Sequence, residues 1–408
     1  MISIEQIKKE LDGAVIPARW ESFADSLGEN ATDFLDDASL RRFHAAYPVF
    51  EEGFDILLAA AEEVRANAAL TAYAALLSRA IFDFDVIQED IAALTLPVAK
   101  DEEGALGYGF MPILACVPHI ANAVDGLRAR GVEDKIIFAT FAYFDRAISD
   151  PVKQGKAPVF PKGQLSWCQH YLHGIILRIG RLEFHWIDDM YGGNFGVYRS
   201  TEGQYRFLAE RGSYHKNGTL VTANSPAEEG DFDATFTETD TDYEANLMGE
   251  TGRVHPDLVK LGKDKWTRIA GYESPVVTVH IPSGPGLSRE NIDAAFRDAL
   301  AVHKRAFSEY GARVFHCHSW LLDTQHRIDL PPDSNILTFQ SKFLHGTTNT
   351  CDNCVFTFLF GMPGYKGDLA ELPEKSSMQR AVKRYMMAGN HIYEQNGIVP
   401  MEWIDEGK

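Results

Sequence analysis

The sequence predicts an α+β or α/β fold in two parts, with a helical N-terminal domain before a mixed-sheet domain that is flanked by helices. Residues 1–150 carry helical apolar spacing almost throughout, and the segment 151–163 is rich in proline, glycine and lysine. Beyond it, strand-like and helix-like segments alternate, as is typical of a sheet covered by helices. We therefore expect domains at 1–150 and 164–408, joined by a linker at 151–163.

The individual elements follow from caps and from the period of the apolar residues. Ser3 with Gln6 forms a capping-box pattern for a first helix, and amphipathic segments predict further helices at 38–66, 68–93, 109–130 and 133–148. In the second part, helices are expected at 164–177, 289–307, 334–344 and 377–389. Strands are expected at 180–186, 195–199, 276–281, 313–318, 354–360 and 398–404. The acidic stretch 228–250 is expected to form a solvated hairpin or loop.

Composition limits the classes of partner. The 408 residues are 45% hydrophobic and carry a formal net charge of -19, which argues against nucleic acid or an anionic membrane surface as the main partner. The chain starts with a charged helical segment, and no apolar run looks long enough to span a bilayer, so we expect a cytoplasmic protein. Five cysteines, few and odd in number, favour reduced thiols. Oligomeric state is not indicated by the sequence.

A glycine-containing loop joins the strand at 276–281 to the helix at 289–307. Such a loop can bind an anion, because the first helical turn has free N–H groups and glycine lets a phosphate approach the backbone. Gly284 and Gly286 lie in the loop, and Ser288 can cap the helix. Glu290 would compete with a phosphate in the first turn, so the residues alone favour an ordinary tight turn.

Two predicted strands deliver histidines near their carboxyl ends. Alternation puts Thr278 with His280 on one face of the first strand, and His316 with His318 on one face of the second, with Cys317 on the opposite face. Because ligands bind outside the carboxyl ends of strands in open sheets, His280 and His318 can converge on one site if the strands are neighbours. Either could take a proton from an amine. The alternative for each is a histidine that hydrogen-bonds to backbone at a strand end.

Other catalytic motifs and metal sites find little support. Cys351-Asp352-Asn353-Cys354 is a single C-x-x-C without a second pair at zinc-finger spacing, so no metal is expected. The sequence lacks a G-x-S-x-G elbow, a P-loop and a Rossmann fingerprint, which disfavours serine hydrolases, P-loop NTPases and dinucleotide-dependent dehydrogenases.

Four ordered motifs together resemble a known family. They lie at 174–184, 280–287, 317–323 and 330–337, and the last three read HIPSGPGL, CHSWLLD and LPPDSNIL. They look like a bacterial family of acyltransferases with a helical N-terminal (N-acyltransferase N-terminal) domain and a GNAT-like C-terminal domain. The resemblance implies an acyl-CoA-dependent N-acyltransferase that transfers an acyl group to a small amine, with acetyl-CoA or a longer acyl-CoA as co-substrate.

The resemblance also implies roles for particular residues. The strand at 276–281 would pair with the pantetheine of acyl-CoA, and the following loop would hold the pyrophosphate. Candidate cofactor-binding residues are Val279, Ile281, Ser283, Gly284, Gly286, Leu287 and Ser288. For the reaction itself, His280 or His318 would be the base, and Ser319 or Asn335 would donate a hydrogen bond.

Two arginines and a departure from the family pattern leave alternatives open. Arg178 and Arg181 could hold an anionic part of cofactor or substrate, or could instead form salt bridges that tie the helical domain to the sheet. The loop lacks the leading Arg or Gln of the signature Q/R-x-x-G-x-G/A, and this favours a catalytically silent GNAT-fold protein that binds a ligand or partner. A third hypothesis is a hydrolase that uses Cys317 and a histidine, and Cys317 could alternatively be a covalent acyl acceptor in acyl transfer.

Overall fold

The computed structural model describes residues 3–11, 13–100, 104–284 and 286–407. The chain divides into two compact units, and the division falls after Ile179. The predicted linker at 151–163 lies inside the first unit: helix α8 (Asp134–Lys153) extends into it, and α9 (Lys162–Leu172) begins at its end. Because α9 packs against α6 and α7, it belongs with the helices rather than with the sheets that follow.

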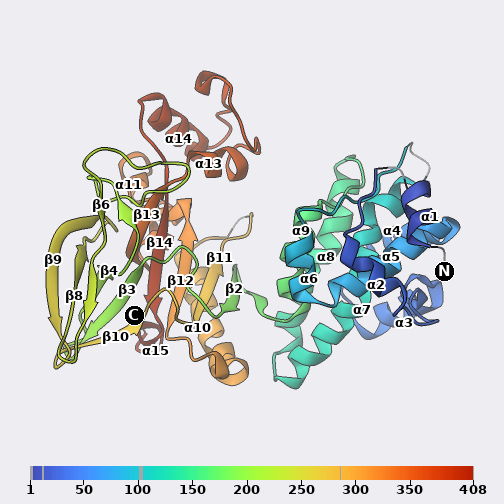
Figure 1. Cartoon of the computed structure of the whole chain (residues 1–408), viewed down its shortest axis with the longest axis horizontal. Coiled ribbons are helices and arrows are strands. Elements are labelled where there is room, and N and C mark those ends of the chain that lie inside the picture. Colours follow the sequence, from blue (N-terminus) through green and yellow to red (C-terminus); the bar gives the residue numbers. More distant parts are fainter. Residues whose placement is uncertain (1–2, 12, 101–103, 285, 408) are drawn as a thin grey trace. The chain divides into compact units, whose positions relative to one another are not determined.

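The first unit is helical (Figure 1). Side-chain caps mark the starts of two helices. The side-chain oxygen Oδ1 of Asn67 accepts from Leu70 N at α5, and Oδ1 of Asp83 accepts from Val86 N at α6. Besides α8 and α9, the unit contains α1 (Ile4–Glu10), α2 (Glu21–Ala24), α3 (Asp37–Ala46), α4 (Phe54–Ala66), α5 (Ala68–Ile81), α6 (Phe84–Asp90), α7 (Ala105–Ala129), the 3₁₀ turns η1 (Ala18–Trp20) and η2 (Asp33–Leu35), and the final strand β1 (Ile176–Ile179).

Helix α7 corrects one expectation from composition. By length and composition it could cross a membrane, so the view that no apolar run is long enough was wrong. In the structure α7 packs against α4, α5, α8 and α9 and buries Phe110, Leu114 and Ile120. These contacts are those of a core helix of the first unit.

The main sheet of the second unit contains strands near those predicted at 180–186, 276–281, 313–318 and 398–404, and also β13, which was not predicted. Its strands follow the order β2-β11-β12-β14-β13, with β11 parallel to β12 and the other pairs antiparallel. They are β2 (Leu182–Ile187), β11 (Val276–His280), β12 (Val314–Ser319), β13 (Leu344–Thr350) and β14 (Tyr393–Pro400). Helix α10 (Arg289–Ala306) covers one face, where Phe296 packs edge-on against Phe184 and Phe315. The predicted fold class, helices followed by a mixed sheet with helices, is confirmed.

A second sheet covers part of the opposite face. Its strands follow the order β10-β3-β4-β8-β7, and β9 pairs with β8. They are β3 (Phe195–Ser200), β4 (Tyr205–Ala209), β7 (Phe236–Glu238), β8 (Asp242–Met248), β9 (Val254–Gly262) and β10 (Trp266–Ala270); β5 (Ser213–Tyr214) and β6 (Phe232–Asp233) form a small pair. The acidic stretch contains the antiparallel hairpin β7–β8, in line with the predicted hairpin.

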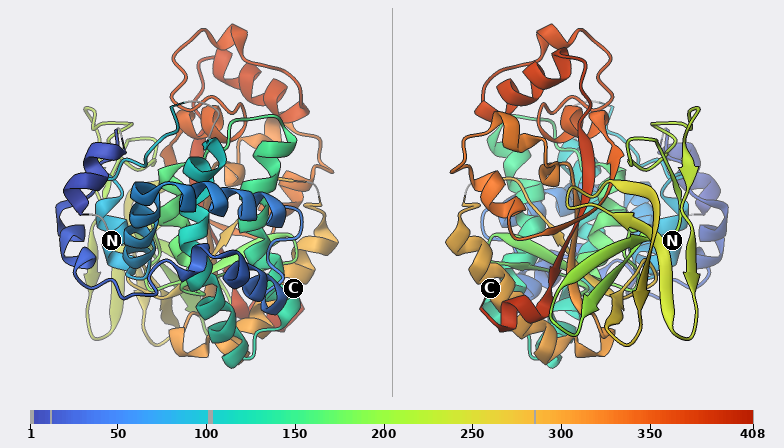
Figure 2. Two further views of the ribbon diagram at one scale, coloured as in Figure 1. Left: turned by 90° about the vertical axis from the view of Figure 1, so that its right-hand side faces the viewer. Right: turned by 90° about the vertical axis from the view of Figure 1, so that its left-hand side faces the viewer.

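The segment that holds α13 (Asp352–Phe358) and α14 (Ser377–Met387), in orange-red, projects beyond the ends of the sheets (Figure 2). It packs around a cluster that includes Trp320, Val355 and Met378. The segment also contains η5 (Leu369–Glu371). The remaining helices and turns of the unit are η3 (Ser308–Tyr310), η4 (Trp320–Leu322), α11 (His326–Asp329), α12 (Asn335–Gln340) and α15 (Met401–Asp405).

Three sequence predictions fail in this region. The strand expected at 354–360 is helix α13, because burial of Val355 in the cluster outweighs the β propensity of the Val-Phe-Thr-Phe run. The strand expected at 398–404 ends at Pro400, where α15 begins. The expectation of reduced thiols is wrong for Cys351 and Cys354, which form a disulfide, because the start of α13 brings their Cα atoms to 5.5 Å.

Candidate functional site

The candidate site lies at the carboxyl ends of two neighbouring parallel strands. β11 pairs with β12 as far as Thr278 and His316, and the register stops there although both strands continue. The strands therefore separate beyond this pair. His280 and His318, each two residues further on, flank the gap on the same face of the sheet. The two strands are thus neighbours, as the hypothesis of a shared site requires.

The face of the sheet that carries His280 and His318 changes from apolar to polar along β11 and β12. Nearer the strand starts, Val276 and Val314 are fully buried in a cluster with Ile398 of β14 and with residues of the second sheet. Two residues further along each strand, the side chains are Thr278 and His316. The second sheet thus anchors the apolar half, and the polar half follows directly at the strand ends.

His316 is fully buried and held at both ring nitrogens. Its Nε2 lies 2.7 Å from Oδ1 of Asn396, and its Nδ1 lies 3.4 Å from the hydroxyl of Thr278. Because an amide oxygen only accepts, Nε2 donates to Asn396 and Nδ1 accepts from Thr278. The Asn396 amide in turn donates to Gly192 O and to the Thr347 hydroxyl. Burial lowers the pKa of His316 to about 3, so this imidazole is neutral and positions its neighbours.

His318 is the better placed of the histidines for proton transfer. Its side chain is 12% exposed, and its Nε2 lies 3.3 Å from Oδ1 of Asn349 and 3.7 Å from a carboxylate oxygen of Glu394. Both neighbours are acceptors, so Nε2 carries a hydrogen, and in the neutral form of the ring the lone pair is on Nδ1. Gly192, with φ +70°, lies against the ring: a Cβ there would come within 3.2 Å of His318 Cε1. The glycine therefore lets the backbone pack directly against the imidazole.

His280 belongs to a second polar pair. Its ring lies 5.6 Å from that of His185 on β2, and the register places His280 opposite Glu183 of the same strand. Both β2 residues are buried. A carboxylate and two imidazoles therefore lie on the β2 side of the gap, while His318 and Glu394 lie on the β12 and β14 side.

The loop after β11 is braced by two side chains. Gly284 and Gly286 have φ of +121° and +91°, conformations that favour glycine. An Arg181 N–H donates to Gly284 O at 2.8 Å, and the Asn291 amide donates to Gly286 O at 2.8 Å. Ser288 caps α10, as predicted, by accepting from Asn291 N. The carbonyl groups of Gly284 and Gly286 are therefore each held by a side chain, just before an 18-residue helix.

The predicted cofactor-binding residues differ in exposure. Ser283, Gly284 and Gly286 are exposed, Ile281, Leu287 and Ser288 are partly buried, and Val279 is buried. Pro285 of the same loop lies outside the described residues. Arg181 contacts the loop as described above. Arg178 belongs to β1 in the first unit, where its N–H donates to the Thr140 hydroxyl.

The described hydrogen bonds do not join the other candidate residues to His280 or His318. The Ser319 hydroxyl accepts from Leu321 N and so caps η4. Asn335 is exposed at the start of α12, which packs against α10 and η4, and the described hydrogen bonds do not join it to either histidine. Cys317 is fully buried, and burial raises the pKa of its thiol. A buried neutral thiol is a poor nucleophile, which disfavours the hydrolase hypothesis.

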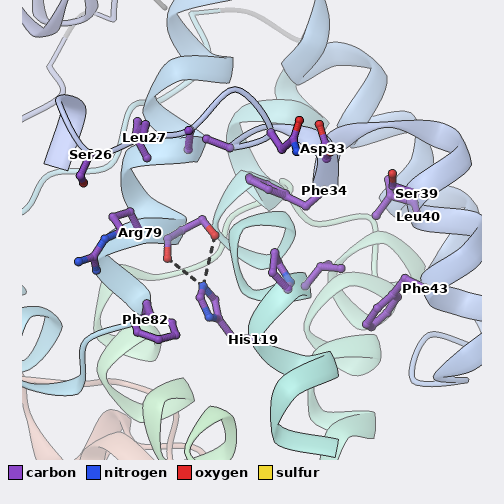
Figure 3. A pocket seen from close by; sticks show the side chains of 17 residues that line it. Ser26, Leu27, Asp33, Phe34, Ser39, Leu40, Phe43, Arg79, Phe82 and His119 are labelled. Atoms are coloured by element: carbon purple, nitrogen blue, oxygen red, sulfur yellow. Dashed lines mark hydrogen bonds between the residues drawn. The ribbon is translucent and has the colours of Figure 1, made fainter. Parts of the chain in front are cut away.

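A separate cavity of about 510 Å³ lies within the helical unit (Figure 3). Its walls include Phe34, Phe43 and Phe82, with His119 at one side. The His119 Nε2 donates to the Ser78 carbonyl oxygen at 2.8 Å, and burial lowers the pKa of the ring. The cavity thus offers an apolar space beside a neutral, fixed imidazole, which suits binding more than acid–base chemistry.

Several residues of the site were not predicted from sequence. Asn349 comes from β13, and Glu394 and Asn396 come from β14. The predicted helix at 334–344 ends at the first residue of β13, so Asn349 lay in no predicted element, and the strand expected at 398–404 starts after both β14 residues. Every position of β14 from Gln395 to Pro400 is buried, so no alternation of polar and buried positions marked Glu394 and Asn396. Glu183 and His185 alternate along the strand predicted at 180–186, and this alternation was the signal that could have placed both on one face of the sheet.

Comparison with known proteins agrees with this architecture. A family model described as the GNAT-like C-terminal domain matches residues 176–399. A solved acyltransferase in complex with decanoyl-CoA and teicoplanin is similar to this chain at 19% identity and a TM-score of 0.61, covering 98% of this chain and 100% of that one. An acyltransferase in complex with CoA and 10C-teicoplanin has 20% identity and a TM-score of 0.59, with the same coverage.

No curated protein sequence matches the chain significantly. The family match, however, covers more than half of the chain and includes both strands of the gap and the loop that follows β11. The chain therefore belongs to the family of proteins with a GNAT-like C-terminal domain.

Proposed function

We propose that this protein is an acyl-CoA-dependent N-acyltransferase that transfers an acyl group to a small amine. The observation that carries the proposal is the gap between β11 and β12, flanked by His280 and His318 and followed by the braced glycine loop at the start of α10. Backbone groups at a strand edge can pair with the amide groups of pantetheine, and a helix N-terminus favours its pyrophosphate.

The chemistry assigned to the gap is direct transfer. The amine nitrogen attacks the thioester carbonyl, the C–S bond breaks, and the proton lost by the amine balances the proton taken up by the CoA thiolate. His318 is the preferred base because its Nδ1 lone pair is available while Glu394 stabilises the positive charge that the ring gains. His316 is unsuited to this role, since both of its nitrogens are engaged and its pKa is about 3.

The comparisons support the acyl donor more than the acceptor. The similar structures are acyltransferases in complex with CoA, decanoyl-CoA or octanoyl-CoA, and two of them also hold teicoplanin or its 10C form. At 18–20% identity the similarity shows the fold alone, so these ligands belong to the similar proteins and are not assigned to this chain. For this chain a small amine is proposed on the chemistry of the histidines, and a medium-chain acyl-CoA is the first donor to test.

Calorimetric titration with CoA, acetyl-CoA and decanoyl-CoA tests the donor site. We expect the wild-type protein to bind, and Gly284→Asp to weaken binding about tenfold or more, because it places a carboxylate in the loop at a φ of +121°. Gly311→Asp is the matched control: Gly311 also has positive φ, and a Cβ there meets open space. Its affinity should equal that of the wild type.

The alternative is a catalytically silent protein that uses the same fold to bind a ligand or partner. The absence of Arg or Gln at the start of the loop signature favours it. Binding of acyl-CoA without acyl transfer to any of a panel of primary amines would support this alternative. Failure of every acyl-CoA to bind would contradict the proposed function itself.

A further inference from the structure

A cluster of two sulfurs and one carboxylate lies next to His318, and the proposed reaction uses only its carboxylate, that of Glu394. Within the described residues, the Sγ atoms of Cys351 and Cys354 and a carboxylate oxygen of Glu394 all lie within 4.8 Å of one another. All three side chains are partly buried. A carboxylate oxygen of Glu394 also lies 3.7 Å from Nε2 of His318.

The backbone around the cluster is fixed by pairing. Cys351 follows directly on β13, and its N–H donates to Ile392 O at 2.8 Å, which continues the pairing with β14. The side chain of Asp352 accepts from Ile392 N at 2.8 Å. Glu394 lies two residues further along β14. The three side chains therefore converge from two anchored segments.

We propose that the reduced Cys351–Cys354 pair and Glu394 form a binding site for a thiophilic divalent cation such as Zn²⁺. Two thiolates and one carboxylate suit Zn²⁺, and three protein ligands leave a fourth position for water. Bonds of about 2.3 Å to zinc in a tetrahedral site put two sulfurs about 3.8 Å apart. With their Cα atoms at 5.5 Å, the cysteines can reach that separation by side-chain rotation.

The disulfide makes the site conditional on reduction. A thiol or dithiol reductant delivers two electrons and two protons to the S–S bond and is itself oxidised to a disulfide. Binding of the cation then releases the two thiol protons, and the sulfurs bind as thiolates. The oxidised pair has no thiolate to offer. The site therefore exists only in the reduced protein, and its presence does not depend on the proposed acyl transfer.

Titration of the full chain with Co²⁺ tests the proposal, because Co²⁺ reports thiolate ligation by a sulfur-to-metal charge-transfer band. After reduction with a phosphine and removal of the reductant, the wild type should bind one equivalent, and Zn²⁺ should displace it with loss of the band. The oxidised protein should show no band. Cys116, Cys168 and Cys317 are buried and present in both forms, so they act as an internal control.

Variants assign the ligands. Cys354→Ser should abolish the band, and Glu394→Gln should weaken Co²⁺ binding about tenfold or more. Glu371→Gln, an exposed carboxylate in the same part of the unit, should bind as the wild type does. A reduced wild type that binds no Co²⁺, or a Cys354→Ser protein that keeps the band, would overturn the proposal. Because Glu394→Gln preserves side-chain shape, an unchanged affinity there would remove Glu394 from the site even if a cysteine variant fails to fold.

Discussion

Replacing His318 with alanine should lower the rate of acyl transfer about a hundredfold or more while acyl-CoA affinity stays the same. The imidazole is held between Asn349 and Glu394, so its loss removes both the base and the ion pair that forms when the ring is protonated. Gly192 already packs closely on this ring, and the change leaves a space rather than a clash. Steady-state turnover and calorimetric affinity, measured on the same preparation, separate these two effects.

The matched replacement His280→Ala assigns the base between the two strands. If His318 is the base, the loss at His280 should be the smaller one. A larger loss at His280 would move the proton transfer to the β2 side of the gap, near Glu183 and His185. Wild-type turnover in both variants would exclude a histidine base for the reaction.

Acidification from pH 7 to pH 5 should lower the free energy of unfolding by about 2 kcal/mol for each histidine whose pKa burial lowers to about 4 or below. Burial lowers the pKa of His316 to about 3 and those of His170 and His345 to about 4. The unfolded chain binds a proton at each of them below about pH 6.5, and the folded chain does not. Stability is therefore complete above pH 6.5 and is lost as the pH falls toward the folded-state pKa.

The contribution of His316 can be isolated by substitution. In His316→Gln one such histidine is gone, so the difference in unfolding free energy between pH 7 and pH 5 should shrink by about 2 kcal/mol, whatever the absolute stability of the variant. Urea unfolding at both pH values gives this difference. His255→Gln, at an exposed position, is the control. Equal pH dependence in wild type and His316→Gln would show that His316 takes up its proton in the folded protein as well.

The sequence contained most of what determines the central strands. Alternation was enough to place His316 and His318 opposite Cys317, because the period of a strand leaves no other choice. It did not reveal that β11 and β12 separate after Thr278, since register depends on partner strands far apart in the chain. Glu394 and Asn349 were missed for the same reason: they reach His318 only through the pairing of β13 with β14.

Helix α13 shows a different limit. Its residues Val355 to Phe358 have strand propensity, but only tertiary contacts decide between a strand and a short helix over such a run. Here Val355 enters the apolar cluster, while Phe358 is 73% exposed. The disulfide at its start is likewise a product of local geometry, which cysteine number and compartment arguments do not capture.

The division of one sheet face into an apolar half and a polar half has a consequence for how this fold can diversify. Val276 and Val314 pack with residues of the second sheet, whereas His280 and His318, four positions further along the same strands, flank the gap. Inheritable changes at the strand ends can therefore alter chemistry without disturbing the packing that secures the scaffold. Related proteins should vary most in the last two residues of β11 and of β12, and least at Val276 and Val314.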